Sequence, residues 1–328
     1  MTPFAYRRAA SVDEAVRLAR APGAHFLGGG TNLIDLAKGG VVKPLLLVDV
    51  SRLPLAEVTE TPDGGVRIGA AVRNSELANH PLIRTRYPLL SQALLAGASP
   101  QLRNMATVGG NLLQRTRCPY FYDIGFEHCN KRAPGSGCGA LEGINRNHAI
   151  LGASAACIAT HPSDMCVALA ALRAQVRVHG PRGERAIAFD QFHRLPGDTP
   201  QRDTTLADGE LVVGVDLPPG GFAGGSHYLK VRDRASYAFA LVAVAAALDV
   251  RGGVVHDAAL ALGGVAHKPW RRPEAEASLV GHAPGDAAFG MAADLLLQGA
   301  RPASQNGFKV ALARRAIVRA LQAAGAQG

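Results

Sequence analysis

The chain has 328 residues, of which 48% are hydrophobic and 19% are charged. This composition is typical of a globular protein with room for two domains, and it excludes a disordered or collagen-like chain. The longest apolar run, residues 239–248, is Ala-rich and about half the length needed to cross a bilayer, so it predicts a buried helix rather than membrane insertion. Arg7 and Arg8 are not followed by an apolar segment, so no export signal is predicted.

The formal net charge is +9, yet aromatic residues make up only 5% of the chain and the arginines are scattered. This pattern argues against a nucleic-acid-binding protein. Positive charge is denser around the cysteine segment, where it would offset an anionic thiolate cluster or a pyrophosphate, or form a solvated face for an acidic partner. The residues concerned are Arg103, Arg115, Arg117, Lys131, Arg132 and Arg146.

The first predicted elements are a helix over 11–20 and a strand over 25–27. Ser11 and Glu14 form a capping-box pattern at the start of that helix. The strand ends in three glycines, 28–30, and a further helix is predicted over 31–37. Glycines allow close approach of a ligand to the backbone, and free amides at a helix start favour phosphate. The segment therefore predicts a pyrophosphate cradle, although it lacks the Rossmann spacing and a triple glycine also occurs in ordinary loops.

The alternation of helices and strands continues beyond this cradle. A second stretch of small residues, 102–112, contains Thr107-Val-Gly-Gly-Asn111 and offers further amide donors. A Pro- and Gly-rich cluster at 218–221 is predicted to close a first domain, 1–221, and a second domain follows over 222–328. The remaining predictions are strands over 43–50, 65–72, 175–178 and 210–217, and helices over 89–98 and 165–172.

All five cysteines fall between 118 and 166, which is not the pattern of a disulfide framework in a small secreted domain. Ten, eight and eighteen residues separate the first four, unlike zinc knuckles or the compact ferredoxin run. The segment 129–138 has too few apolar residues to bury its cysteines as hydrophobes, so metal or cluster ligation is favoured over free buried thiols. Cys166 lies in an apolar helix and reads as a core residue.

The order of these motifs resembles that of a known family. The strings LGGGTNLIDLAKGG (27–40), LRNMATVGGNLLQ (102–114), HPSD (161–164) and YLKVRDR (228–234) are similar to those of the FAD-binding subunit of the molybdenum hydroxylases, the xanthine dehydrogenase superfamily. The resemblance implies an α+β fold: a two-part FAD-binding domain of the PCMH, vanillyl-alcohol-oxidase-like, type and a small α+β domain of the CO dehydrogenase flavoprotein type. The insertion at about 115–160 is most similar to that of the FAD and [4Fe-4S] subunit of bacterial periplasmic aldehyde oxidoreductases.

The resemblance also implies which residues hold the cofactors. Asp164 would bond sugar or ribityl hydroxyls of the FAD, although it would serve equally as a helix N-cap, and Lys230 would lie near the flavin ring or in a surface ion pair. Relatives often carry an acid where this chain has Ala238. The implied FAD residues are Phe26, Leu27, Gly28, Gly29, Gly30, Thr31, Asn32, Leu33, Thr107, Gly109, Gly110, Asn111, Asp164, Leu211, Val212 and Lys230, and the implied cluster ligands are Cys118, Cys129, Cys138 and Cys157. His128 and His148 are left outside this ligand set.

No paired carboxylates or activated nucleophile are found, so no catalytic residue is predicted in this chain. The resemblance implies an electron-transfer subunit of a molybdenum-containing aldehyde oxidoreductase. A large molybdenum-cofactor subunit and a small subunit with two [2Fe-2S] centres would supply electrons to FAD and then to an external acceptor. Two alternatives stay open: a self-sufficient flavin oxidoreductase and a zinc-stapled, non-enzymatic assembly subunit. The likeness implies a periplasmic location by co-export with a signal-bearing partner; the alternative is cytoplasmic.

Overall fold

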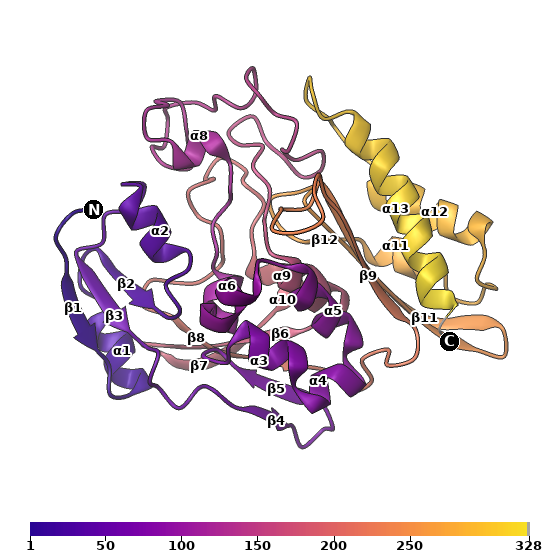
Figure 1. Cartoon of the computed structure of the whole chain (residues 1–328), viewed down its shortest axis with the longest axis horizontal. Helices are drawn as coiled ribbons and strands as arrows, with labels where there is room; N and C mark the ends of the chain where they lie inside the picture. The colour runs from indigo at the N-terminus through magenta and orange to yellow at the C-terminus, as the bar shows by residue number, and fades with distance from the viewer. Residues whose placement is uncertain (327–328) are drawn as a thin grey trace.

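The computed structural model describes residues 1–326, whose strands form three sheets (Figure 1). The first sheet is parallel, in the order β1-β3-β2, and the helices α1 and α2 alternate with its strands. The Ser11 hydroxyl accepts a hydrogen bond from the Glu14 amide and so caps α1. The bounds are β1 (Ala5–Arg8), α1 (Val12–Leu18), β2 (Ala24–Leu27), α2 (Leu33–Lys38) and β3 (Leu46–Asp49).

The second sheet is antiparallel, in the order β4-β5-β8-β6-β7, and helices cover one of its faces. Residues from these helices and strands form the largest hydrophobic core of the described chain. The strands are β4 (Val58–Glu60), β5 (Val66–Gly69), β6 (Gln175–Gly180), β7 (Gly183–Ala188) and β8 (Leu211–Leu217). The helices are α3 (Asn74–Asn79), α4 (Pro81–Arg86), α5 (Pro88–Ala96), α6 (Pro100–Met105), α7 (Val108–Leu112), α9 (Asp164–Ala171) and α10 (Phe189–Phe192).

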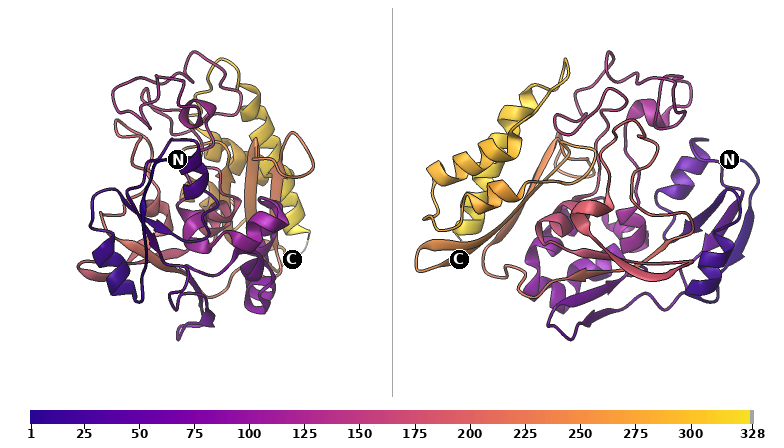
Figure 2. Two further views of the ribbon diagram at one scale, coloured as in Figure 1. Left: turned by 60° about the vertical axis from the view of Figure 1, so that its left-hand side comes forward. Right: turned by 180° about the vertical axis from the view of Figure 1, so that it is seen from behind.

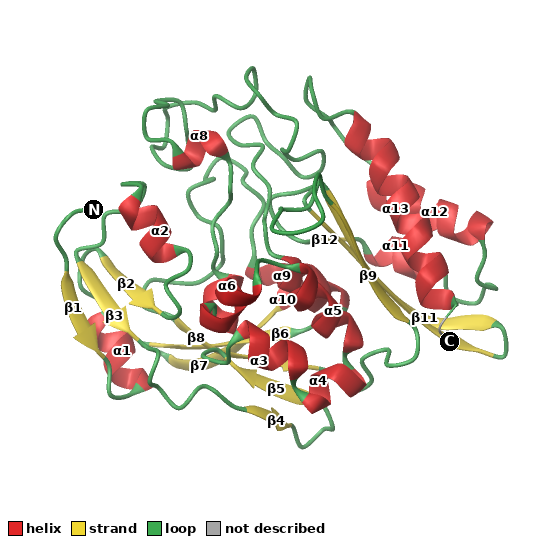
Figure 3. Cartoon of the chain, viewed as in Figure 1, coloured by secondary structure: helices red, strands yellow, loops and turns green. Residues whose placement is uncertain are grey.

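The segment 115–160 leaves this sheet domain as a run of loops. Its one helix within the described residues is α8 (Pro119–Tyr122), and Figure 3 shows how little regular structure surrounds it. Isolated bridges pair Cys129 with Cys138 and Ser154 with Cys157. The segment lies across the top of the molecule, between α2 and the C-terminal helices, in Figure 1 and in the right-hand view of Figure 2.

The C-terminal part is an antiparallel sheet in the order β12-β11-β10-β9, covered on one face by helices. Its elements are β9 (Ser226–Val231), β10 (Val242–Arg251), β11 (Val254–Gly263), β12 (Trp270–Arg271), α11 (Pro273–Ala277), α12 (Asp286–Leu297) and α13 (Phe308–Gly325). Of the helices in the described residues, none is both long enough and apolar enough to span a membrane.

The helix predicted over 239–248 is wrong, because residues 242–248 of this run lie in the strand β10. Ala243 and Ala245 face the core of the first domain, whereas Val242 and Val244 face α13 and its neighbours. Both faces of the strand are therefore buried, and the alternation of polar and apolar residues that identifies a half-exposed strand is missing. The high helix propensity of alanine was then the remaining signal, and it favoured a helix.

Candidate functional site: an interdomain cavity beside a cysteine cluster

A cavity of about 690 Å³ lies between the two domains and the insertion. This volume is within the range of cofactor sites. Thr31, Gly110 and Asp164 line it from the first domain, and Lys230 and Gly264 line it from the C-terminal domain. A molecule bound here would touch both domains at once.

The two glycine segments meet at the edge of this cavity. A Cβ atom on Gly29 would lie 1.9 Å from the Met105 carbonyl oxygen, so only glycine allows the two backbones to approach as they do. Thr107 caps α7 by accepting a hydrogen bond from the Gly110 amide. Within the described residues, the amides of 29–32 donate no hydrogen bond. Free amides at a glycine turn before a helix suit a pyrophosphate.

Two asparagine side chains of the predicted set are already engaged. Asn32 donates to the Tyr122 hydroxyl (3.3 Å) and accepts from the Arg115 amide (2.9 Å), which joins the first cradle to the insertion. The Asn111 side-chain oxygen accepts from the Ser163 hydroxyl (2.7 Å). Both residues still line the cavity. In this structure the two asparagine side chains connect the segments that form the wall of the cavity.

Asp164 is the first residue of α9, and Ser163 is the N-cap instead. The Asp164 carboxylate accepts from the Tyr228 hydroxyl (2.7 Å) and from the Lys230 ammonium group (2.8 Å), both on β9. Lys230 is therefore a buried ion-pair partner, with a side chain only 4% exposed. Burial and the Asp164 charge hold the pKa of Tyr228 well above its usual value, so it remains a donor. This group ties α9 to the C-terminal sheet at the cavity.

The other predicted FAD residues do not line the cavity. Leu211 and Val212 are buried in β8, in two different core clusters. A Cβ on Gly109 would lie 3.2 Å from the side chain of Ala70, so this glycine serves close packing. The predicted residues that do line the cavity are Thr31, Asn32, Gly110, Asn111, Asp164 and Lys230, and those that do not are Phe26, Leu27, Gly28, Gly29, Gly30, Leu33, Thr107, Gly109, Leu211 and Val212.

Sequence reasoning missed two aromatic residues at the cavity. Tyr237 and Phe239 line it, and both side chains are more than half exposed. Tyr237 has a φ of 49°, an uncommon backbone conformation for a bulky residue. The Arg117 guanidinium lies 5.4 Å from the Phe239 ring centroid. The only sequence signal was their position in the Tyr-Ala-Phe-Ala segment around Ala238.

The four predicted cluster cysteines converge on one small cavity of about 10 Å³. Cys118, Cys129, Cys138 and Cys157 all line it, and none of the five cysteines forms a disulfide within the described chain. Burial raises the pKa of the Cys118 thiol to about 12 and that of Cys157 to about 11, while the charge of Lys131 opposes the second shift. Four soft donors around one point form the donor set of an iron–sulfur or zinc centre. Ligation would have to displace their protons.

A buried charge network adjoins the cysteines. Lys131 lines their cavity, its side chain is only 1% exposed, and its ammonium group contacts Asp203. Arg115 also donates to the Asp203 carboxylate (2.7 Å). Burial alone would raise the pKa of Asp203, but the charges of Lys131 and Arg115 outweigh it and hold that pKa below its ordinary value. The network leaves net positive charge next to the thiols, which suits an anionic cluster.

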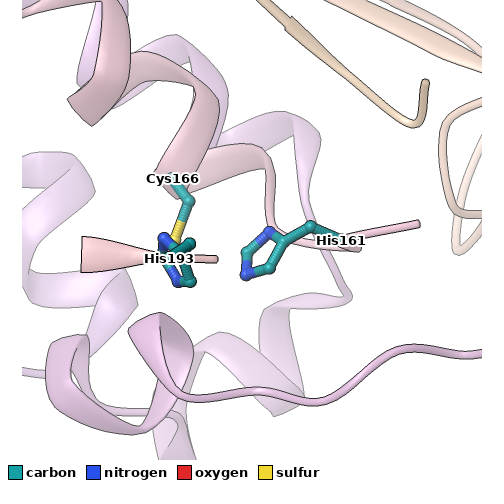
Figure 4. Close-up of side chains that lie close together, drawn as sticks. All are labelled: His161, Cys166 and His193. Atoms are coloured by element: carbon teal, nitrogen blue, oxygen red, sulfur yellow. The ribbon is translucent and has the colours of Figure 1, made fainter. Parts of the chain in front are cut away.

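The fifth cysteine belongs to a separate group. The ligand atoms of His161, Cys166 and His193 lie within 4.8 Å of one another, and Figure 4 shows the His161 ring pointing toward His193, with an angle of 62° between the ring planes. His161 Nδ1 accepts from the Ser163 amide, so its proton is on Nε2, whereas His193 Nε2 donates to the Leu112 carbonyl (2.8 Å) and leaves a lone pair on Nδ1. The other two ring nitrogens, His161 Nε2 and His193 Nδ1, are buried without a hydrogen-bond partner in the described chain.

The two cavities share part of their walls. Thr116, Cys118 and His148 line both the large interdomain cavity and the cysteine cavity. His148 Nε2 lies 3.1 Å from the Cys118 sulfur. Burial lowers the pKa of His148 to about 4, so its ring is neutral near pH 7. The cofactor-sized cavity and the four-cysteine cavity are therefore adjacent, with single side chains between them.

Comparisons with known proteins agree with this architecture. Residues 2–220 match the family model "FAD binding domain in molybdopterin dehydrogenase", and residues 227–324 match the "CO dehydrogenase flavoprotein C-terminal domain". The chain is 52% identical over 330 residues to the aldehyde oxidoreductase FAD-binding subunit PaoB of Escherichia coli, with 100% of both chains covered. It is 30% identical to the glyceraldehyde dehydrogenase medium chain of Sulfolobus acidocaldarius, covering 85% of this chain and 81% of the relative.

Solved structures show the same fold. A chain of carbon monoxide dehydrogenase from Hydrogenophaga pseudoflava superposes with a TM-score of 0.77 at 28% identity, covering 100% of this chain and 99% of that one. A chain of the reconstituted CO dehydrogenase from Oligotropha carboxidovorans gives a TM-score of 0.78 at 24% identity, with 100% and 99% covered. The predicted fold class is confirmed. The chain belongs to the FAD-binding subunits of the molybdenum hydroxylases, and it is a subunit of an oxidoreductase.

Proposed function

We propose that this chain is the electron-transfer subunit of a molybdenum-containing aldehyde oxidoreductase, holding FAD in the interdomain cavity and a [4Fe-4S] cluster on the four cysteines. The observation that carries the proposal is the adjacency of the two cavities, which share Cys118 and His148. The aldehyde specificity of the complex rests on the 52% identity to an aldehyde oxidoreductase subunit.

The chain's own residues account for cofactor binding and positioning. The amides of Thr31 and Asn32, which line the cavity and donate no hydrogen bond within the described residues, would bind the pyrophosphate, and Asp164 would orient sugar or ribityl hydroxyls from the start of α9. When bound, FAD supplies the exchange between one-electron and two-electron chemistry. Cys118, Cys129, Cys138 and Cys157 would ligate the cluster as thiolates, with Lys131 balancing part of its negative charge.

The remaining chemistry belongs to partners. We propose a large subunit with the molybdenum cofactor, where the aldehyde is oxidised, and a small subunit with two [2Fe-2S] centres that carries electrons to this chain. An external acceptor would then be reduced at the flavin.

The test is anaerobic purification followed by quantification of FAD, iron, acid-labile sulfide and zinc per chain. We expect one FAD with about four irons and four sulfides. Cys129→Ser should lose most of the iron and keep FAD, whereas the matched control Cys166→Ser should keep both, because Cys166 lies outside the four-cysteine cavity. Zinc in place of iron would instead support a stapled assembly subunit. Aldehyde turnover by the isolated chain would support a self-sufficient flavoenzyme.

A further inference from the structure

His148 occupies a distinctive position among the residues that line both cavities. It is 4% exposed, and its Nε2 atom is 3.1 Å from the sulfur of Cys118. Its other ring nitrogen, Nδ1, is buried without a hydrogen-bond partner in the described chain. Within the described chain, Cys118 is therefore the only polar contact of the His148 ring.

The backbone around His148 is fixed from two sides. Its amide donates to the Asn145 carbonyl (2.9 Å). Its own carbonyl accepts from the Lys309 ammonium group (2.9 Å) and from the Asn306 side chain (3.2 Å), both in the C-terminal domain. Asn306 and Lys309 are themselves buried. These bonds fix the backbone from which the buried ring projects toward Cys118.

The chemistry of the contact determines which atom carries the proton. A cysteine that ligates iron is a thiolate and has no proton to donate. A hydrogen bond to this thiolate then requires that His148 Nε2 carry the proton and act as the donor. Nδ1 is left with a lone pair, and in the described chain this atom has no hydrogen-bond partner. Hydrogen bonds to ligand sulfur stabilise the more negative, reduced form of a cluster and raise its reduction potential.

We propose that His148 is a positioning residue that raises the reduction potential of the cluster by donating a hydrogen bond from Nε2 to the Cys118 sulfur, at the wall shared with the FAD cavity. The inference rests on the proposed function, since it requires a cluster on the four cysteines. It extends that function by assigning a role to a residue outside the ligand set. Cys118 and His148 line both cavities, so the proposed hydrogen bond lies at their shared wall.

The experiment is a potentiometric titration of the purified, cofactor-loaded complex, with the reduced cluster followed by EPR. In His148→Phe the ring remains and the donor is lost. We expect the equilibrium constant for cluster reduction to fall about tenfold at a given potential, which is ~59 mV for a one-electron couple. His148→Gln restores a donor and should return the potential most of the way to wild type. The matched control is His128→Gln: His128 lines the same cavity, and its Nδ1 contacts the Ser136 carbonyl instead of a sulfur.

The outcomes separate the two proposals. Wild-type protein without iron and sulfide would refute the cluster itself. A loaded cluster whose potential is unchanged in His148→Phe would overturn the role of His148 alone, as would an equal shift in His128→Gln. If His148→Phe fails to assemble the cluster, the potential of His148→Gln tests the role of His148 instead. A loaded glutamine variant near the wild-type potential supports donation, and one shifted to lower potential by the full amount contradicts it.

Discussion

At the scale of single residues, Gly29 shows how a sequence motif becomes a site. The triple glycine predicts a cradle, but it does not say what the glycines approach. In the structure the missing side chain of Gly29 makes room for the Met105 carbonyl, 76 positions along the chain. That carbonyl also accepts a hydrogen bond from Arg73. The contact sets the spacing between the two cradles, and such tertiary approaches cannot be inferred from the spacing of glycines in one segment.

Replacing Gly29 with alanine should therefore weaken FAD binding. The new Cβ would lie 1.9 Å from backbone oxygen, so residues 26–33 and 105–107 must move apart. We expect a loss of tenfold or more in FAD affinity, about 1.4 kcal/mol or more, measured by flavin fluorescence titration of the deflavinated protein. Gly39→Ala is the control, because the nearest atom to its added Cβ is 3.7 Å away. Full flavin content with unchanged affinity in Gly29→Ala would contradict the cradle.

At the scale of elements, the sequence predicted the wholly buried helix α9 but was wrong at β10. The capping pattern at Ser11 predicted the start of the first helix. The Pro- and Gly-rich cluster at 218–221 lies between β8 and β9. β10 was missed because its small alanines pack against α5 and α9 on one side and α13 on the other. The convergence of the four cysteines came from resemblance to a family, since irregular loops carry no periodicity from which to infer a contact.

Helix α13 contributes a buried lysine with an unusual pKa. Lys309 donates to the carbonyl of His148 (2.9 Å) and to that of Gly264, and burial lowers its pKa to about 7. Between pH 7 and the ordinary lysine value near 10.4, the unfolded chain binds this proton more tightly, so stability rises with pH. We expect the free energy of unfolding of wild type, relative to Lys309→Met, to increase by about 1 kcal/mol per pH unit from pH 8 to 9.

Urea denaturation at several pH values would measure this difference, with the cofactor content matched between the two proteins. Because the methionine variant has no titrating group at this position, groups common to both proteins cancel. A difference independent of pH in this range would mean that Lys309 titrates alike in the folded and unfolded chains. The His148 carbonyl would then be held by a charged lysine at all these pH values.

At the scale of the whole molecule, Asp203 joins parts that are distant in sequence. Lys131 and Arg115 reach it from the insertion, and His267 Nε2 lies 3.7 Å from it in the C-terminal domain. Nothing in the sequence pairs Asp203 with Lys131, 72 positions away. The network places positive charge beside the cysteines while keeping the three parts together. Sequence reasoning noted the basic residues but not the carboxylate that organises them.

Asp203→Asn should destabilise the whole chain. The substitution leaves Lys131 buried without its counter-charge, which costs about 3 kcal/mol when a buried pair is broken. The double variant Asp203→Asn, Lys131→Met removes both charges and should recover much of the loss. Chemical denaturation of the four proteins of this cycle gives the coupling energy. Equal and additive effects of the two changes would show that the pair contributes nothing as a unit.

The link between the insertion and the first glycine segment has a consequence for how the two proposed cofactors would be installed. Asn32 accepts a hydrogen bond from the Arg115 amide, at the start of the loops that carry the four cysteines. Disorder in those loops, in a chain that lacks the proposed cluster, would therefore extend to the flavin site. We expect such a chain to be cleaved faster by proteases within residues 115–160 than the cofactor-loaded protein.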